Sequence, residues 1–116
     1  MDERLAQALD FASFRHSLAL EKKRLKEKLK SDLTIAHNGG IFNIDRNFLG
    51  FLSFISEDND SGSAVVLDDR QVPILIDDIT KFRTDAVRKY FQLTNQYYLD
   101  FEALKKKRTV KDLVNL

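Results

Sequence analysis

Residues 79–108 read ITKFRTDAVRKYFQLTNQYYLDFEALKKKR and contain the strongest periodic pattern of this chain. Apolar and aromatic residues recur there at spacings of three and four, which places their side chains on one face of an α-helix. An aspartate just before the run, Asp77 or Asp78, can accept hydrogen bonds from the first free amides of that helix. The pattern predicts a long helix over residues 78–108. Its apolar stripe consists of Ile79, Phe82, Ala86, Tyr90, Leu93, Tyr97, Phe101 and Leu104.

A second amphipathic segment lies at the start of the chain, where leucines at positions 18, 25, 29 and 33 recur at spacings of seven, four and four. This pattern predicts a helix from about residue 3 to about residue 37, ending at His37-Asn38-Gly39-Gly40 because glycine adopts the left-handed conformation that closes helices. Both helices exceed the ordinary helix length. Each must therefore pack against another long element or another copy of the chain, and we expect self-association as a dimer or higher oligomer.

The middle of the chain predicts shorter elements: strands over 41–44, 64–67 and 72–76, and a helix over 46–56 that Asp45 caps. That short helix is apolar around most of its circumference, so we expect it to be buried in the core. The order of elements predicts an α+β fold with a small, mainly antiparallel sheet, in a single domain over 1–116. A winged helix-turn-helix is the weaker alternative, because it needs two consecutive short helices before its hairpin. Residues 109–116 are predicted as a short turn or docking tail.

The composition excludes several classes of protein. Among the 116 residues there is no cysteine, which rules out disulfides, thiolate nucleophiles and the usual sulfur-rich zinc sites. The first residues, MDERLAQALDF, do not resemble a signal peptide, and no apolar run reaches the roughly 20 residues that cross a bilayer. We therefore expect an intracellular, cytoplasmic protein that makes no contact with membranes.

The net charge is only +1, but the charges are unevenly distributed, and residues 21–30, EKKRLKEKLK, hold six cations and two anions. A second basic cluster ends the long helix at 105–108. A solvated helix surface accounts for each cluster, and cations in a last turn also stabilise the helix dipole. The alternative is that both clusters form one patch that neutralises the phosphates of a nucleic acid. The candidate binding residues are Lys23, Lys26, Lys30, Lys105, Lys106, Lys107 and Arg108.

Aromatic side chains could add base stacking to such a surface. Most aromatic residues of the long helix lie on its apolar stripe and are predicted to belong to the core. Tyr98 and Phe91 lie off the centre of the stripe, so they are the candidates for contact with bases.

No catalytic motif stands out. The chain has only four glycines and contains no phosphate-binding loop, no nucleophile elbow and no dinucleotide fingerprint. The aspartate pairs at 68–69 and 77–78 lie where turns and helix caps need aspartate, and they would support an enzyme only if they converged in one pocket. The segment 57–68 departs from a calcium-binding loop at its last ligand and at its exit. The sequence thus predicts a protein that is not an enzyme and has no cofactor and no metal site.

Two stretches, VVLDDRQVPILIDDITKF (65–82) and TNQYYLDFEALKKKRTVKDLV (94–114), combine a strand-turn-strand, a capped aromatic helix and a basic end followed by an apolar tail. Together they resemble the C-terminal half of small uncharacterised proteins encoded by contractile-tailed marine cyanophages. The resemblance implies a phage or marine microbial origin and a non-enzymatic role, and it assigns no site residue. With that origin, the cytoplasm would be that of the infected host.

Two hypotheses about function follow. The first is an interaction protein that binds nucleic acid through its basic helical segments. The second is a structural or assembly component, virion or accessory, that associates through its apolar helix stripes and its C-terminal tail. Salt separates them, because phosphate contacts weaken steeply with ionic strength whereas an apolar interface does not.

Overall fold

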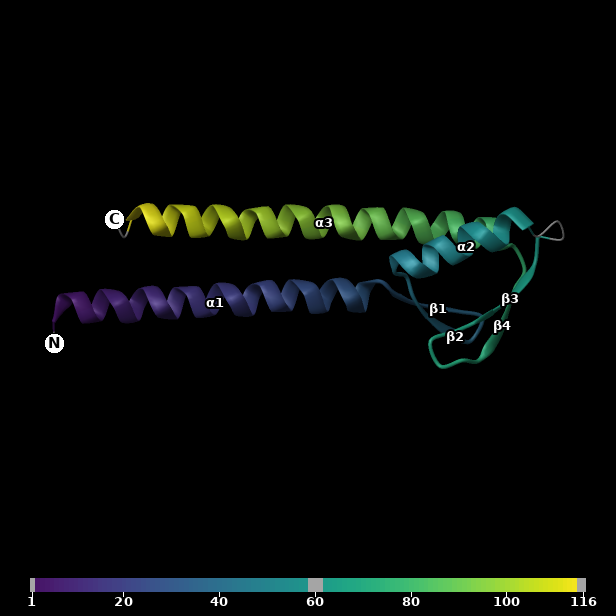
Figure 1. The fold of residues 1–116 in the computed structure, drawn as a ribbon, viewed down its shortest axis with the longest axis horizontal. Coiled ribbons are helices and arrows are strands. Elements are labelled where there is room, and N and C mark those ends of the chain that lie inside the picture. Colours follow the sequence, from purple (N-terminus) through teal and green to yellow (C-terminus); the bar gives the residue numbers. More distant parts are fainter. Residues whose placement is uncertain (1, 59–61, 115–116) are drawn as a thin grey trace. The chain divides into compact units, whose positions relative to one another are not determined.

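The computed structural model describes residues 2–58 and 62–114, with side chains for 2–57 and 62–107. Within these residues the chain contains three helices and four strands (Figure 1). In chain order they are α1 (Glu3–Asp32), β1 (Thr34–His37), β2 (Gly40–Asn43), α2 (Arg46–Asp58), β3 (Ala64–Leu67), β4 (Pro73–Ile76) and α3 (Ile79–Val114). The predicted α+β class with two long helices is confirmed.

The described chain divides into two compact units. The first combines the chain up to Lys28 with the chain from Gln96 onward, and the second is the continuous segment Leu29–Asn95. Both long helices therefore contribute residues to each unit. The prediction of a single domain is not tested by this division and stays a prediction.

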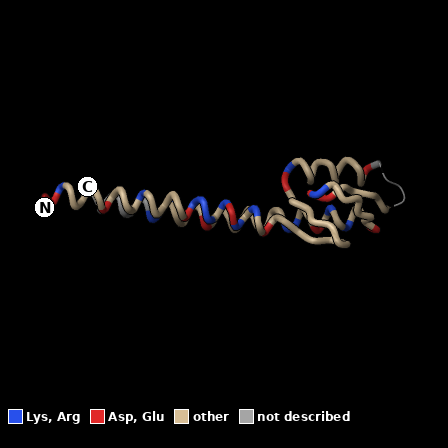
Figure 2. Tube along the Cα trace, turned by 90° about the horizontal axis from the view of Figure 1, so that it is seen from below, with Lys and Arg blue, Asp and Glu red and all other residues tan. Residues whose placement is uncertain are grey.

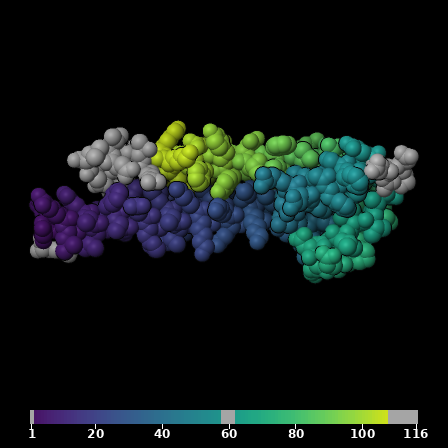
Figure 3. All heavy atoms as spheres, viewed as in Figure 1, coloured from purple at the N-terminus to yellow at the C-terminus, as the bar shows by residue number. Residues whose placement is uncertain are grey.

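In the first unit, α1 and α3 run antiparallel and lie side by side (Figures 1 and 3). Their shared seam buries Leu18 of α1 and Leu104 of α3, which are the buried residues of this unit among the described side chains. Around them the seam contains the partly buried Phe11, Phe14, Leu25, Tyr97 and Phe101. The pairing explains why both helices carry apolar residues at helical spacing along this part of the chain.

The second unit includes the last residues of α1, and here the sequence prediction was wrong at one boundary. The helix ends at Asp32, and residues 34–37, predicted as its last turn, form strand β1, which pairs with β2 in an antiparallel hairpin. Asn38 and Gly39 form the two-residue turn with φ of 48° and 81°. Positive φ at both positions is the type I′ conformation that asparagine followed by glycine favours. His37 therefore ends a strand, not a helix, and its ring lies 4.8 Å from that of Phe82.

Strands β3 and β4 form a second antiparallel hairpin, so the described residues contain two two-stranded sheets where the sequence predicted one. The two hairpins are joined through the loop after β3. Asp68 accepts a hydrogen bond from the amide of Ile41 at 3.0 Å, and the amide of Asp69 donates to the carbonyl of Ile41 at 2.9 Å. These hydrogen bonds run between the loop and β2, whereas within the described residues neither β3 nor β4 pairs with β1 or β2 as a strand.

The core of the second unit lies between the hairpins, α2 and the first part of α3. Its largest fully buried side chains are those of Phe42, Ile44, Leu52, Val66, Ile76 and Ile79. The caps follow the sequence prediction, since Asp45 accepts from the amide of Phe48 at 2.7 Å and Asp78 from that of Lys81 at 3.0 Å.

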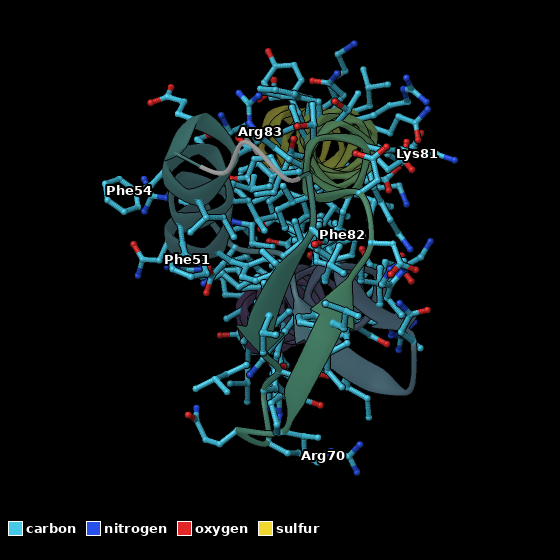
Figure 4. The ribbon with its side chains drawn as sticks, turned by 90° about the vertical axis from the view of Figure 1, so that its right-hand side faces the viewer. Phe51, Phe54, Arg70, Lys81, Phe82 and Arg83 are labelled. Atoms are coloured by element: carbon cyan, nitrogen blue, oxygen red, sulfur yellow. The ribbon has the colours of Figure 1, made fainter. Side chains whose placement is uncertain are left out.

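Helix α2 is not enclosed by the core as predicted. Leu52 is 0% exposed, whereas Phe54 is 65% exposed and points away from the rest of the unit together with Phe51 (Figure 4). The helix therefore buries one face only. On its inner side, Ser53 accepts a hydrogen bond from Nε of Arg83 on α3 at 3.0 Å.

Helix α3 continues to Val114, so the backbone of the predicted tail is helical up to that residue. The side chains from Arg108 onward, and residues 115–116 entirely, lie outside the described part of the chain. The proposed role of 109–116 in docking therefore stays a prediction.

Candidate nucleic-acid interface

A groove of about 690 Å³ runs along one flank of the helical seam in the first unit. We call it the lysine–tyrosine groove, and it is lined by Ala19, Lys22, Lys23, Lys26, Tyr97, Tyr98 and Phe101. The α1 residues are spaced by three and four, so they share one side of that helix, and the α3 residues do the same. The short side chain of Ala19 leaves the space between longer neighbours that makes the surface hollow. Lysines form one wall of the groove and aromatic rings form the other.

The two basic clusters meet at the ring of Phe101. The ammonium of Lys22 on α1 lies 5.4 Å from the centroid of this ring, and that of Lys105 on α3 lies 5.5 Å from it. Both distances are within the range in which a cation is attracted to the face of an aromatic ring. Cations from residues 21–30 and from residues 105–108 thus share one aromatic contact within the first unit.

The groove lysines are available to an anionic ligand. Among the described residues, no carboxylate lies within ion-pair distance of Lys22, Lys23 or Lys26. Lys105, in contrast, pairs with Glu102 at 3.2 Å. Basic positions, coloured blue in Figure 2, recur along the helices with acidic positions between them. The uncompensated charge of the groove therefore comes chiefly from α1.

The predicted binding residues do not all meet at this site. Lys23 and Lys26 line the groove, and Lys105 lies beside it at Phe101. Lys30 belongs to the second unit, and Lys106 and Lys107 are exposed on α3 without lining the groove. The side chain of Arg108 is outside the described residues. The candidate lysines of α1 are thus divided between the units, with Lys23 and Lys26 in the first and Lys30 in the second.

Sequence reasoning did not select Lys22, Tyr97 and Phe101 as site residues. Lys22 lies at the edge of the apolar stripe, four residues after Leu18, and the two aromatic residues lie on the stripe of α3. The stripe predicts core positions for the two aromatic residues, and Tyr97 and Phe101 are partly buried, with ring centroids 6.0 Å apart. A lysine next to an apolar stripe is the signal that could have indicated a contact with an aromatic ring on the partner helix.

A second hollow, of about 350 Å³, lies at the start of α3 in the second unit. It is bordered by His37, the carboxylates of Asp77, Asp78 and Asp85, and two lysines. Asp78 already caps α3, and Asp68 and Asp69 do not line this hollow. The aspartate pairs considered for acid–base chemistry therefore do not converge. Within the described residues, no group of three or more histidine, aspartate or glutamate side chains is arranged to hold a metal ion.

None of the helices, over the residues that the structure describes, combines the length and apolar character needed to cross a membrane. Comparison of the chain with protein-family models, with curated proteins and with solved structures finds no match, and the resemblance to cyanophage proteins stays a prediction.

Proposed function

We propose that this protein binds nucleic acid through the lysine–tyrosine groove of its first unit. The observation that carries the proposal is the contact of Lys22 and Lys105 with one ring, Phe101, because it joins the two basic clusters beside a groove that contains two further lysines. A polymer of phosphates is the anionic partner that matches several cations in a row. Aromatic rings in the same groove suit a ligand that carries bases as well as charge.

Charge neutralisation gives the proposal a measurable consequence. Each phosphate that a lysine neutralises contributes about 0.9 to the log–log dependence of the binding constant on salt for duplex DNA, and about 0.7 for a single strand. With three or four lysines engaged, raising the salt from about 50 mM to about 200 mM should weaken binding between roughly 20-fold and 150-fold. An apolar contact with the same surface would hardly respond to that change.

The test uses fluorescence anisotropy of labelled oligonucleotides at several salt concentrations. The double variant Lys23→Gln, Lys26→Gln should bind more weakly and show a smaller salt slope than the unmodified chain. The matched control is Arg24→Gln, Lys28→Gln, which removes the same charge from exposed positions of α1 that do not line the groove. Equal losses in both double variants, or no binding at about 50 mM salt, would contradict the proposal. Equal affinity for poly-L-glutamate would indicate an acidic protein as the partner instead.

A second candidate function is assembly with another copy of the chain, and the opposite face of α1 favours it. Leu5, Leu9 and Leu20 point away from the seam and are about half exposed. If α1 pairs antiparallel with α1 of a second copy about an axis between residues 14 and 15, Leu9 faces Leu20 of that copy. The same register sets residues 2–14, with three acids and one base, against residues 15–27, with five bases and two acids. Opposite charges along such a pair stabilise it.

Sedimentation equilibrium over a range of protein concentrations tests the assembly. The substitution Leu20→Gln should shift the measured mass toward that of one chain, 13.4 kDa. Ala103→Gln is the control, since it introduces the same side chain at an exposed position of α3 instead of α1. A mass of one chain for the unmodified protein at high concentration would rule this candidate out.

A further inference from the structure

The aromatic residues of the lysine–tyrosine groove differ in how accessible their rings are. Phe101 already faces the ammonium groups of Lys22 and Lys105, and Tyr97 is partly buried against Phe101. Tyr98, in contrast, is 62% exposed although it lines the same groove. One aromatic ring therefore remains free for contact with a ligand along a groove whose other rings belong to the seam.

The cations lie across the groove from that ring. Lys23 and Lys26 project from α1, one helical turn apart, and both are exposed. The groove volume of about 690 Å³ falls within the range of roughly 300–1,000 Å³ typical of sites that hold small organic ligands. A nucleotide within a strand offers the matching chemistry, with a flat base on one side and anionic phosphates on the other.

We propose that the groove takes an unpaired nucleotide of a single-stranded nucleic acid, with its base stacked on Tyr98 and its flanking phosphates held by Lys23 and Lys26. This inference rests on the proposed function and narrows it. In a duplex the faces of the bases are stacked on one another, so a ring on the protein surface can reach a base face only where the strand is unpaired. A surface that bound duplexes alone would need the lysines but would have no use for an exposed ring between them.

The decisive experiment compares three labelled polymers of about 20 nucleotides: a deoxythymidine strand, the same backbone without bases, and a duplex. Stacking is worth about 1–3 kcal/mol per base, so the deoxythymidine strand should bind between about 5-fold and about 150-fold more tightly than the abasic backbone. Tyr98→Leu should abolish this preference and leave affinity for the abasic backbone unchanged. Tyr98→Trp, which keeps an aromatic face, should retain the preference. The same measurement with oligouridine shows whether RNA is taken as well.

The control for the loss of a ring is Phe91→Leu, which removes an exposed aromatic residue of α3 that does not line the groove. This variant should bind all three polymers like the unmodified chain. Circular dichroism of each variant checks that the helices are intact. If the abasic backbone and the duplex bind as tightly as the deoxythymidine strand, and Tyr98→Leu has no effect, the stacking inference is wrong while the proposed function stands. If no polymer binds at about 50 mM salt, both fail.

Discussion

Oδ2 of Asp68 lies 3.0 Å from the backbone nitrogen of Ile41, which donates a hydrogen bond to it from 27 residues earlier in the chain. The other carboxylate oxygen, Oδ1, accepts from the amides of Arg70 and Val72, each at 2.9 Å. One side chain thus closes the turn between β3 and β4 and also attaches that turn to β2. Asp68 is only 3% exposed, so its charge is compensated by these amides more than by water.

Replacing Asp68 with asparagine should destabilise the second unit. An amide side chain has one acceptor oxygen instead of two, so at least one of the three backbone amides would face an NH₂ group. A buried donor that loses its acceptor is strongly unfavourable. We expect a lower urea midpoint for Asp68→Asn than for Asp69→Asn, because Asp69 is exposed and its side chain accepts one bond, from Asn43 at 3.2 Å. Equal midpoints would show that the buried hydrogen bonds of Asp68 contribute no more to stability than the exposed hydrogen bond of Asp69.

The same contacts predict a dependence of stability on pH. The hydrogen bond from the amide of Ile41, followed by that from Val72, lowers the pKa of Asp68 below its ordinary value of 3.8. The unfolded chain therefore binds a proton at a pH where the folded chain does not, and stability rises with pH in that window. The contribution of Asp68 is present above about pH 4 and is lost as the pH falls through the lower pKa of the folded state. Urea unfolding of the unmodified chain between pH 2 and 6 should show this loss, and Asp68→Asn should show a flatter profile.

Gly40 and Gly50 should respond in opposite directions to replacement by alanine. A Cβ on Gly40 in β2 would lie 2.6 Å from Cγ1 of Ile74 and 3.1 Å from Cε2 of Phe42, inside the packed core. A Cβ on Gly50 in α2 would meet no atom within 4 Å. Gly40→Ala should therefore destabilise by about 1–3 kcal/mol through overpacking, and Gly50→Ala should stabilise by about 0.5–1 kcal/mol through helix propensity. Urea denaturation of the two variants measures both, and a stable Gly40→Ala would mean that Ile74 can move aside.

The course of α3 could be predicted because its pattern is local: eight apolar positions at spacings of three and four need no knowledge of the partner. The end of α1 could not be predicted in this way. Leu33 continues the leucine spacing of the helix, yet it lies after the last helical residue and is buried in the core of the second unit. The pair Asn38-Gly39 predicts a helix stop, although asparagine followed by glycine is also the strongest short signal for a hairpin. The pair forms a hairpin turn because residues 34–37 and 40–43 pair as antiparallel strands, and this pairing is not visible in the helical spacing of the leucines.

For the candidate site, too, the local patterns could be predicted from the sequence, but the contacts between distant segments could not. The common side of Lys23 and Lys26 on α1 follows from their spacing of three residues, and Tyr98 could be placed off the apolar stripe of α3. The groove itself depends on how α1 and α3 are aligned, because that alignment brings Lys22 to Phe101 and sets Ala19 opposite the tyrosines. Spacing along one helix contains no information about the register between two helices. The sequence therefore indicated the residue types of the site but not its shape.

Because α2 is buried on one side only, alanine substitutions at Leu52 and Phe54 should have very different effects on the free energy of unfolding. Leu52→Ala should destabilise by about 2–5 kcal/mol, because Leu52 is fully buried and its loss leaves a cavity. Phe54→Ala should change stability by no more than about 0.5 kcal/mol, because the Phe54 ring lies largely in solvent. Chemical denaturation of both variants measures the contrast. A large loss for Phe54→Ala would instead show that this ring is covered in solution, for example by another copy of the chain.

The backbone amides of the two units should differ in their rates of hydrogen exchange. Among the described side chains, the first unit buries Leu18 and Leu104, whereas the second has a core cluster of ten buried residues. Long helices held by few buried contacts open locally at a lower free energy than strands and helices around a core. We expect the amides of Phe42, Ile44 and Ile76 to exchange roughly tenfold or more slowly than those near Leu18, as measured by NMR. Addition of a ligand that fills the lysine–tyrosine groove should slow exchange in the first unit alone, whereas equal protection of both units in the free chain would contradict the expectation.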